Sequence, residues 1–276
     1  MIRPLASGAL GVFLGAALLP FAGSAFAQTV GTSRTKIPQD PAAVELNRLL
    51  TAAEDAVNKQ DYASAAQDYQ AYLAKKPDDA VVHYDLGYAY TALQKPADAK
   101  SEYEKAIALD PKMAAAYQNL GVTLIPTDPA AAIEPLQQAA ELMPEDARTK
   151  WLLGIALEAT KKDAPAIEQY QAAEKLDAKS VEIRNSLGFA LLRTGRAGEA
   201  ETAFCDALAL QPTGAAAEQA HKGLLRALLA QKKNDEAATE MGVYLAAHPG
   251  DATMQLEHAS LLVDAGKDDD ALAELD

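Results

Sequence analysis

The chain has 276 residues, 39 of them acidic and 25 basic, and a formal net charge of −14 at pH 7. A protein this acidic repels the phosphate backbone of nucleic acids and anionic lipid headgroups, so we expect neither among its partners. The single cysteine, Cys205, excludes a disulfide bond within the chain.

Residues 1–27 have the features of a secretory signal peptide. Arg3 gives a positive amino-terminal region, an apolar run follows, and the A-x-A pattern of residues 25–27 ends it. We expect cleavage near Ala27-Gln28 and export to the periplasm or the exterior; an uncleaved membrane anchor is the alternative. Residues 28–41 are polar and aperiodic, which predicts a flexible leader. No later apolar run approaches the roughly 18–20 residues of a membrane helix, so no membrane span is predicted in the mature chain.

From residue 42 onward, a repeat of about 34 residues organises the chain. Prolines that follow an alanine-rich apolar segment recur at this spacing, with one absent at Ala178. They are Pro77, Pro111, Pro144, Pro212 and Pro249. Such a period predicts stacked units of similar structure, each too small to bury its apolar face alone.

A second pattern lies inside the units. The segments YDLGYAY, QNLGVTL, WLLGIAL and NSLGFAL share the pattern Leu-Gly-x-x followed by an aromatic or aliphatic residue. About twelve residues after each glycine comes an alanine, then a large apolar residue four positions on and usually an alanine three beyond it. Spacings of three and four place residues on one face of a helix, so each unit is predicted to be two amphipathic helices joined by a turn.

The patterns L-G-x-x-Y and A-x-x-x-F/Y-x-x-A, with the closing proline, resemble the tetratricopeptide repeat (TPR) family. This resemblance implies an all-α solenoid, a right-handed superhelix of helix-turn-helix repeats, over residues 42–276. We place the units at about 46–79, 80–113, 114–146, 147–180, 181–214 and 218–251, with an incomplete seventh at 252–276.

Small residues in this pattern are expected to mark the points where helices approach closely. Gly87, Gly121, Gly154 and Gly188 fill this role in the first helices, and alanines 65, 99, 132, 166, 200, 237 and 271 in the second. Large side chains between them, such as Tyr103, Tyr170 and Phe204, are predicted to fill the remaining space.

Several units depart from the pattern. About three extra residues near 215–217 predict a longer first helix in unit six. Pro135 falls inside a second helix and is expected to kink it. Tyr72 and Tyr244 replace a small alanine, where we expect the interfaces to splay slightly. The last unit stops at Asp276 before its second helix completes the repeat, which favours a natural chain that continues; a frayed terminus is the alternative.

No combination of residues predicts catalysis, a cofactor or a metal site. The histidines, His83, His221, His248 and His258, lack the close helical spacing of metal ligands. The acidic run at residues 264–270 lacks the order of a calcium loop and is interpreted as a helix-capping turn. Cys205 is expected to be an inert, half-buried thiol, with an intermolecular disulfide as the alternative. We therefore expect a protein that is not an enzyme.

The resemblance implies that the first helices line a concave groove, which we expect to bind an extended peptide. The family's groove positions map onto Tyr84, Tyr88, Gln118, Asn119, Arg148, Trp151, Ile155, Asn185, Phe189, Arg193, Lys222 and Arg226. Aromatic anchors and amides suit a peptide, whose backbone needs polar partners and whose side chains need pockets. The alternative for several of these residues is ordinary packing, Trp151 above all.

We expect a non-enzymatic, exported bacterial scaffold that binds a protein or peptide partner within a cell-envelope complex. The alternative is the N-terminal repeat arm of a longer envelope enzyme or polysaccharide-assembly protein whose catalytic part lies beyond residue 276. Self-association through the C-terminal end is a third hypothesis.

Overall fold

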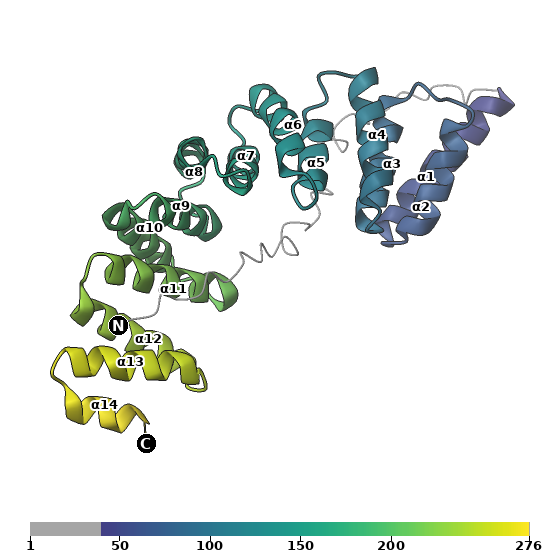
Figure 1. Ribbon diagram of the computed structural model, residues 1–276. Coiled ribbons are helices and arrows are strands. Elements are labelled where there is room, and N and C mark those ends of the chain that lie inside the picture. Colours follow the sequence, from purple (N-terminus) through teal and green to yellow (C-terminus); the bar gives the residue numbers. More distant parts are fainter. Residues whose placement is uncertain (1–39, 276) are drawn as a thin grey trace. The chain divides into compact units, whose positions relative to one another are not determined.

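The computed structural model describes residues 40–275, which form an array of helices that follow one another in chain order (Figure 1). The predicted signal peptide and nearly all of the predicted leader lie outside these residues. Within residues 40–275 there are fourteen α-helices and no strands, which confirms the all-α prediction. Among the described helices, none combines the length and apolar composition that crossing a bilayer requires.

The helix bounds are α1 (Pro41–Asn58), α2 (Tyr62–Leu73), α3 (Ala80–Ala92), α4 (Pro96–Leu109), α5 (Ala114–Leu124), α6 (Pro129–Leu142), α7 (Ala147–Ala159), α8 (Asp163–Leu176), α9 (Val181–Arg193), α10 (Ala197–Ala209), α11 (Gly214–Ala230), α12 (Asn234–Ala247), α13 (Ala252–Asp264) and α14 (Asp268–Leu275). Helices α3, α5, α7 and α9 carry the Leu-Gly segments, and even-numbered helices carry the alanine pattern. The packing described below lies within Glu45–Asp276, which forms one compact unit.

Polar residues at the helix starts set the register of the repeat. Asp79, Asp146 and Ser180 precede α3, α7 and α9, and each side chain accepts a hydrogen bond from the backbone N–H three residues on. Asp251 caps α13 in the same way. These caps satisfy backbone donors that have no partner inside the helix, and so fix where α3, α7, α9 and α13 begin.

The glycines of the Leu-Gly segments mark close helix contacts, as predicted. A Cβ built on Gly188 would lie 2.6 Å from Cζ of Phe204, and one on Gly154 would lie too close to the ring of Tyr170. Both rings are fully buried. The seven alanines predicted as contact points in the second helices are also buried: residues 65, 99, 132, 166, 200, 237 and 271. A large ring of one helix therefore packs directly on the glycine of its neighbour.

Successive first helices share one face of the solenoid. Each helix from α2 onward packs on the next in the chain, and α3, α5, α7, α9 and α11 also contact one another in that order. We call the surface that these five helices form the odd-helix face. Residues on it that are one unit apart in sequence can therefore meet in space.

The departures from the repeat have specific structural outcomes. The predicted lengthening of the first helix in unit six is confirmed, because α11 has 17 residues. Helix α6 runs through Pro135 without ending there. Tyr72 and Tyr244 are buried, and their hydroxyls donate to the capping carboxylates of the following helices, at 2.9 Å to Asp79 Oδ2 and 3.2 Å to Asp251 Oδ2. Each tyrosine therefore binds the residue that caps the first helix of the following unit.

Candidate interaction face

All twelve residues predicted for the groove lie on the odd-numbered helices. Helix α3 carries Tyr84 and Tyr88, α5 carries Gln118 and Asn119, α7 carries Arg148, Trp151 and Ile155, α9 carries Asn185, Phe189 and Arg193, and α11 carries Lys222 and Arg226. Asn185 is buried, Arg193 and Arg226 are exposed, and the other nine are half-buried. The structure also shows what each side chain touches within the chain.

A series of hydrogen bonds joins neighbouring first helices through these residues. Asn119 Nδ2 donates to the hydroxyl of Tyr84 at 3.1 Å, and Trp151 Nε1 donates to Ser186 Oγ at 2.9 Å. Tyr84 and Trp151 each lie three positions before the glycine of their own helix. Each therefore occupies the same place in the repeat and contacts the next first helix.

The amide side chains that lie three positions before the glycine in α5 and α9 also contact residues of the following first helix. Gln118 Nε2 donates to Thr149 Oγ1 in α7 at 2.6 Å and to Oδ2 of Asp146, which caps α7, at 2.8 Å. Asn185 Nδ2 donates to the backbone carbonyl of Ala216 at 3.0 Å. Asn185 Oδ1 is buried without a hydrogen-bond partner. The amide N–H groups predicted to serve a ligand therefore have partners inside the chain, and the face they line is held rigidly.

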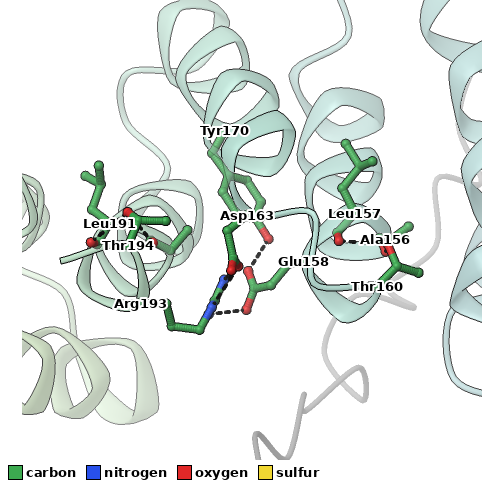
Figure 2. A network of polar contacts seen from close by, with 10 residues as sticks. Ala156, Leu157, Glu158, Thr160, Asp163, Tyr170, Leu191, Arg193 and Thr194 are labelled. Atoms are coloured by element: carbon green, nitrogen blue, oxygen red, sulfur yellow. Dashed lines mark hydrogen bonds and ion pairs between the residues drawn. The ribbon is translucent and has the colours of Figure 1, made fainter. Parts of the chain in front are cut away.

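Arg193 is held in a network between units, which Figure 2 shows in close-up. Its Nη1 donates to Glu158 Oε1 at 2.7 Å and its Nε to Asp163 Oδ1 at 3.0 Å. Glu158 Oε2 also accepts a hydrogen bond from the hydroxyl of the buried Tyr170, at 2.7 Å. Burial acts to lower the pKa of the guanidinium, but the two carboxylates raise it above its usual value. The network fastens α9 to α7 and α8.

The other predicted cations differ in their surroundings. Lys222 Nζ donates to Glu218 Oε1 at 2.6 Å and lies 5.3 Å from the ring centre of the buried Tyr244. Arg148 is half-buried, and Arg226 is exposed. The positive end predicted for the groove therefore includes a lysine with a carboxylate partner, whereas the guanidinium of Arg226 lies in solvent.

Aromatic and aliphatic side chains form a stripe along the odd-helix face. Tyr88, Ile155 and Phe189 each lie directly after a Leu-Gly glycine and are half-buried. The ring of Phe189 packs edge-on against Phe204 with centroids 5.0 Å apart, and Tyr88 packs edge-on against Tyr62 at 6.1 Å. Tyr62, at the start of α2, is a residue that sequence reasoning missed.

Asp85 is a second residue that sequence reasoning missed. It lies between Tyr84 and the Leu-Gly pair of α3, and it is half-buried. Burial raises the pKa of its carboxyl to about 7, and the charges of Glu54 and Asp79 act in the same direction. The available signal was the acidic residue in YDLG, where the other three segments carry the uncharged Asn119, Leu152 and Ser186.

His83 is held inside the fold, whereas Cys205 is exposed as a residue, so the prediction that Cys205 is half-buried is wrong. His83 Nδ1 lies 2.6 Å from Glu102 Oε2, both side chains being buried, and its Nε2 lies 2.8 Å from the carbonyl of Pro77. The thiol of Cys205 is nevertheless partly buried. This burial raises the pKa of the thiol, and the negative charges of nearby carboxylates raise it further. Within residues 40–275, no group of three or more His, Cys, Asp or Glu side chains is placed to hold a metal ion.

Solved structures with the same fold come from several bacterial proteins. MamA from Desulfovibrio magneticus RS-1, from its residue 41 to its end, has a TM-score of 0.59 at 21% identity and covers 60% of this chain and 95% of its own. PilF from Pseudomonas aeruginosa has a TM-score of 0.62 at 19% identity, and the match covers 80% of this chain and 100% of PilF. YrrB, described as a TPR protein with an unusual peptide-binding site, has a TM-score of 0.60 at 19% identity, and the match covers 74% of this chain and 100% of YrrB. At these identities the likeness concerns the fold.

A search among curated proteins found no match. The family model for the tetratricopeptide repeat matches residues 50–114, 84–125, 127–181, 164–220 and 185–252. These ranges cover more than half of the sequence, and the helix pairs, glycine contacts and stacked first helices described above agree with them. The chain belongs to the tetratricopeptide repeat family.

Proposed function

We propose that the protein is a non-enzymatic scaffold that binds a segment of a protein partner along its odd-helix face. The observation that carries this proposal is the stripe of Tyr88, Ile155 and Phe189, which occupy the same place in three of the four Leu-Gly segments and remain partly in solvent. Val122, at that place in α5, is buried. Large apolar and aromatic side chains at the centre of an interface supply most of its binding free energy.

The hydrogen bonds between units support the same proposal. The stripe lies beside the bonds from Trp151 to Ser186 and from Asn119 to Tyr84, which hold neighbouring first helices in one register. A surface that is rigid before binding loses less conformational entropy when a partner docks. YrrB, which shares the fold, is described as having a peptide-binding site.

A photocrosslinking experiment tests this function without disturbing the fold. A benzophenone amino acid replaces either Tyr88 or Ile155 on the odd-helix face, or one of two exposed leucines on even-numbered helices, Leu109 and Leu176. We expect crosslinked partner only from positions 88 and 155. Equal crosslinking from positions 109 and 176 would contradict the proposal.

We also propose that the protein is exported and works within a cell-envelope complex. The support is the sequence of residues 1–27, which has a positive start, an apolar run and an A-x-A site. Mass spectrometry of the protein purified from the periplasmic fraction should give an amino terminus at Gln28. Recovery only from the cytoplasm with an intact Met1 would refute export.

The C-terminal end supplies a second candidate surface, for self-association. Helices α13 and α14 border an open apolar hollow of about 460 Å³, and Leu256, Val263 and Leu272, which line it, are 62%, 54% and 65% exposed. Light scattering should show an assembly that Leu256→Glu converts to monomer. A wild-type monomer at high concentration would sink this proposal.

A further inference from the structure

Five residues at the start of the solenoid form a surface that differs from the rest of the odd-helix face. We call Glu54, Tyr62, Tyr84, Asp85 and Tyr88 the acidic aromatic patch. The rings of Tyr62 and Tyr88 pack edge to face at 6.1 Å, all three tyrosines are half-buried, and Glu54 is exposed. Helix α3, which carries three of the five residues, contains no lysine or arginine.

The repeat explains why Asp85 lacks a partner of its own. The equivalent residues in α5 and α9 are Asn119 and Ser186. They are hydrogen-bonded to Tyr84 and Trp151, which lie three positions before the glycine of the preceding first helix. For Asp85, the residue at that preceding place is Leu50, which has no polar side-chain atom. Among the described residues, no hydrogen bond or ion pair reaches the carboxylate of Asp85 or of Glu54.

We propose that the acidic aromatic patch binds an arginine or lysine side chain of a protein segment that lies along the odd-helix face. This inference rests on the proposed function and names the chemistry of one end of the partner. The carboxylate of Asp85 gives the cation an ion pair, and Glu54 adds negative charge at the solvent side. The faces of Tyr88 and Tyr62 give it a cation–π contact. Arginine fits better than lysine, because its planar guanidinium can pair with a carboxylate and stack on a ring together.

Charge complementarity selects this occupant over others. An apolar side chain would leave the Asp85 carboxylate buried without a partner, and an acidic one would add a like charge beside it. A cation removes both costs. The charged groups that act on Asp85 are Glu54 from α1 and Asp79 before α3, and Asp79 is itself paired with Lys76 at 2.6 Å. Tyr69 from α2 lies near Asp85, and Tyr103 from α4 lies near Tyr84 and Tyr88, so within the described part of the chain no cation acts directly on the Asp85 carboxylate.

A bound cation should also make recognition depend on pH. With the pKa of Asp85 at about 7 in the free protein, the carboxyl is largely protonated at pH 6 and largely ionised at pH 8. A cation favours the ionised form, so binding releases a proton and weakens as the pH falls through 7.

The experiment uses the full chain and two fluorescein-labelled peptides of the same Gly-Ser background, one with two arginines and one with two glutamates at the same positions. Fluorescence anisotropy at about 0.15 M salt measures the affinity, so that long-range attraction is screened. Wild type is compared with Asp85→Asn and with Tyr88→Leu, which keeps apolar bulk but removes the ring. Asp206→Asn is the matched control, because it removes the same charge from an exposed position on α10.

We expect wild type to bind the arginine peptide and not the glutamate peptide. The affinity for the arginine peptide should be about tenfold lower in Asp85→Asn and in Tyr88→Leu, and within about twofold of wild type in Asp206→Asn. Binding by wild type should fall between pH 8 and pH 6, and the pH dependence should vanish in Asp85→Asn. Equal losses in Asp85→Asn and Asp206→Asn would assign binding to net charge and overturn the proposal, as would no binding of the arginine peptide. If crosslinks from position 155 persisted in that case, the face would still bind a partner, of different chemistry.

Discussion

The sign of a glycine substitution should depend on what faces the glycine. Gly188 lies inside α9, where alanine improves helix propensity by about 1 kcal/mol. Its Cβ would lie 2.6–2.8 Å from three ring atoms of Phe204, which is fully buried. On its other side, the same ring lies so close to Gly223 that a Cβ there would also collide with it. The ring therefore has no room to shift.

Overpacking of this kind costs about 1–3 kcal/mol, which outweighs the gain in propensity. We expect Gly188→Ala to destabilise the fold by up to about 2 kcal/mol. Gly242, inside α12, is the matched control, because the nearest atom to its Cβ would be Cε1 of His258 at an ordinary 3.6 Å. Gly242→Ala should therefore stabilise the fold by about 0.5–1 kcal/mol.

Urea denaturation followed by far-ultraviolet circular dichroism measures both changes as shifts of the midpoint at unchanged slope. In a second test, Phe204→Leu should cost less in the Gly188→Ala background than in wild type, because the smaller side chain relieves the collision. If Gly188→Ala stabilises the protein as much as Gly242→Ala does, the close helix contact inferred at Gly188 is wrong.

The remaining predictions concern polar groups. Arg193→Ala should lower the free energy of unfolding by about 1–3 kcal/mol in urea melts, because Glu158 and Asp163 lose their charged partner. Arg196→Ala, which removes an exposed pair with Glu199, should have a clearly smaller effect. Asp85→Asn should raise the melting temperature more at pH 8 than at pH 5. The protonated carboxyl stabilises the fold fully below its unfolded value near 3.8, and that stability is lost as the pH rises through 7. A pH-independent difference would refute this.

The fold was predictable because the residues that determine it recur. Glycines 87, 121, 154 and 188 and the alanines of the second helices repeat in phase, and their contacts depend on size alone. The partner of each polar side chain does not follow from this period. Trp151 bonds a residue of the next unit and Asn119 one of the preceding unit, and these contacts depend on how closely two first helices approach.

The site was predictable only in part, for the same reason. The twelve predicted residues do lie on the first helices, but the sequence could not show that Arg193 is held by Glu158 and Asp163. Asp85 was missed because its character comes from an absence. The equivalent residues Asn119 and Ser186 each have a polar partner in the preceding first helix, whereas the corresponding residue for Asp85 is Leu50, which cannot form a hydrogen bond through its side chain. This difference is visible only once the helices are aligned in space.

The central claim is that partners bind along the odd-helix face. Hydrogen–deuterium exchange of the protein, alone and with a partner recovered by crosslinking, tests it most directly. We expect new protection in α3, α5, α7 and α9, with α4, α6, α8 and α10 unchanged. Protection confined to the even-numbered helices or to α13 and α14 would contradict the claim.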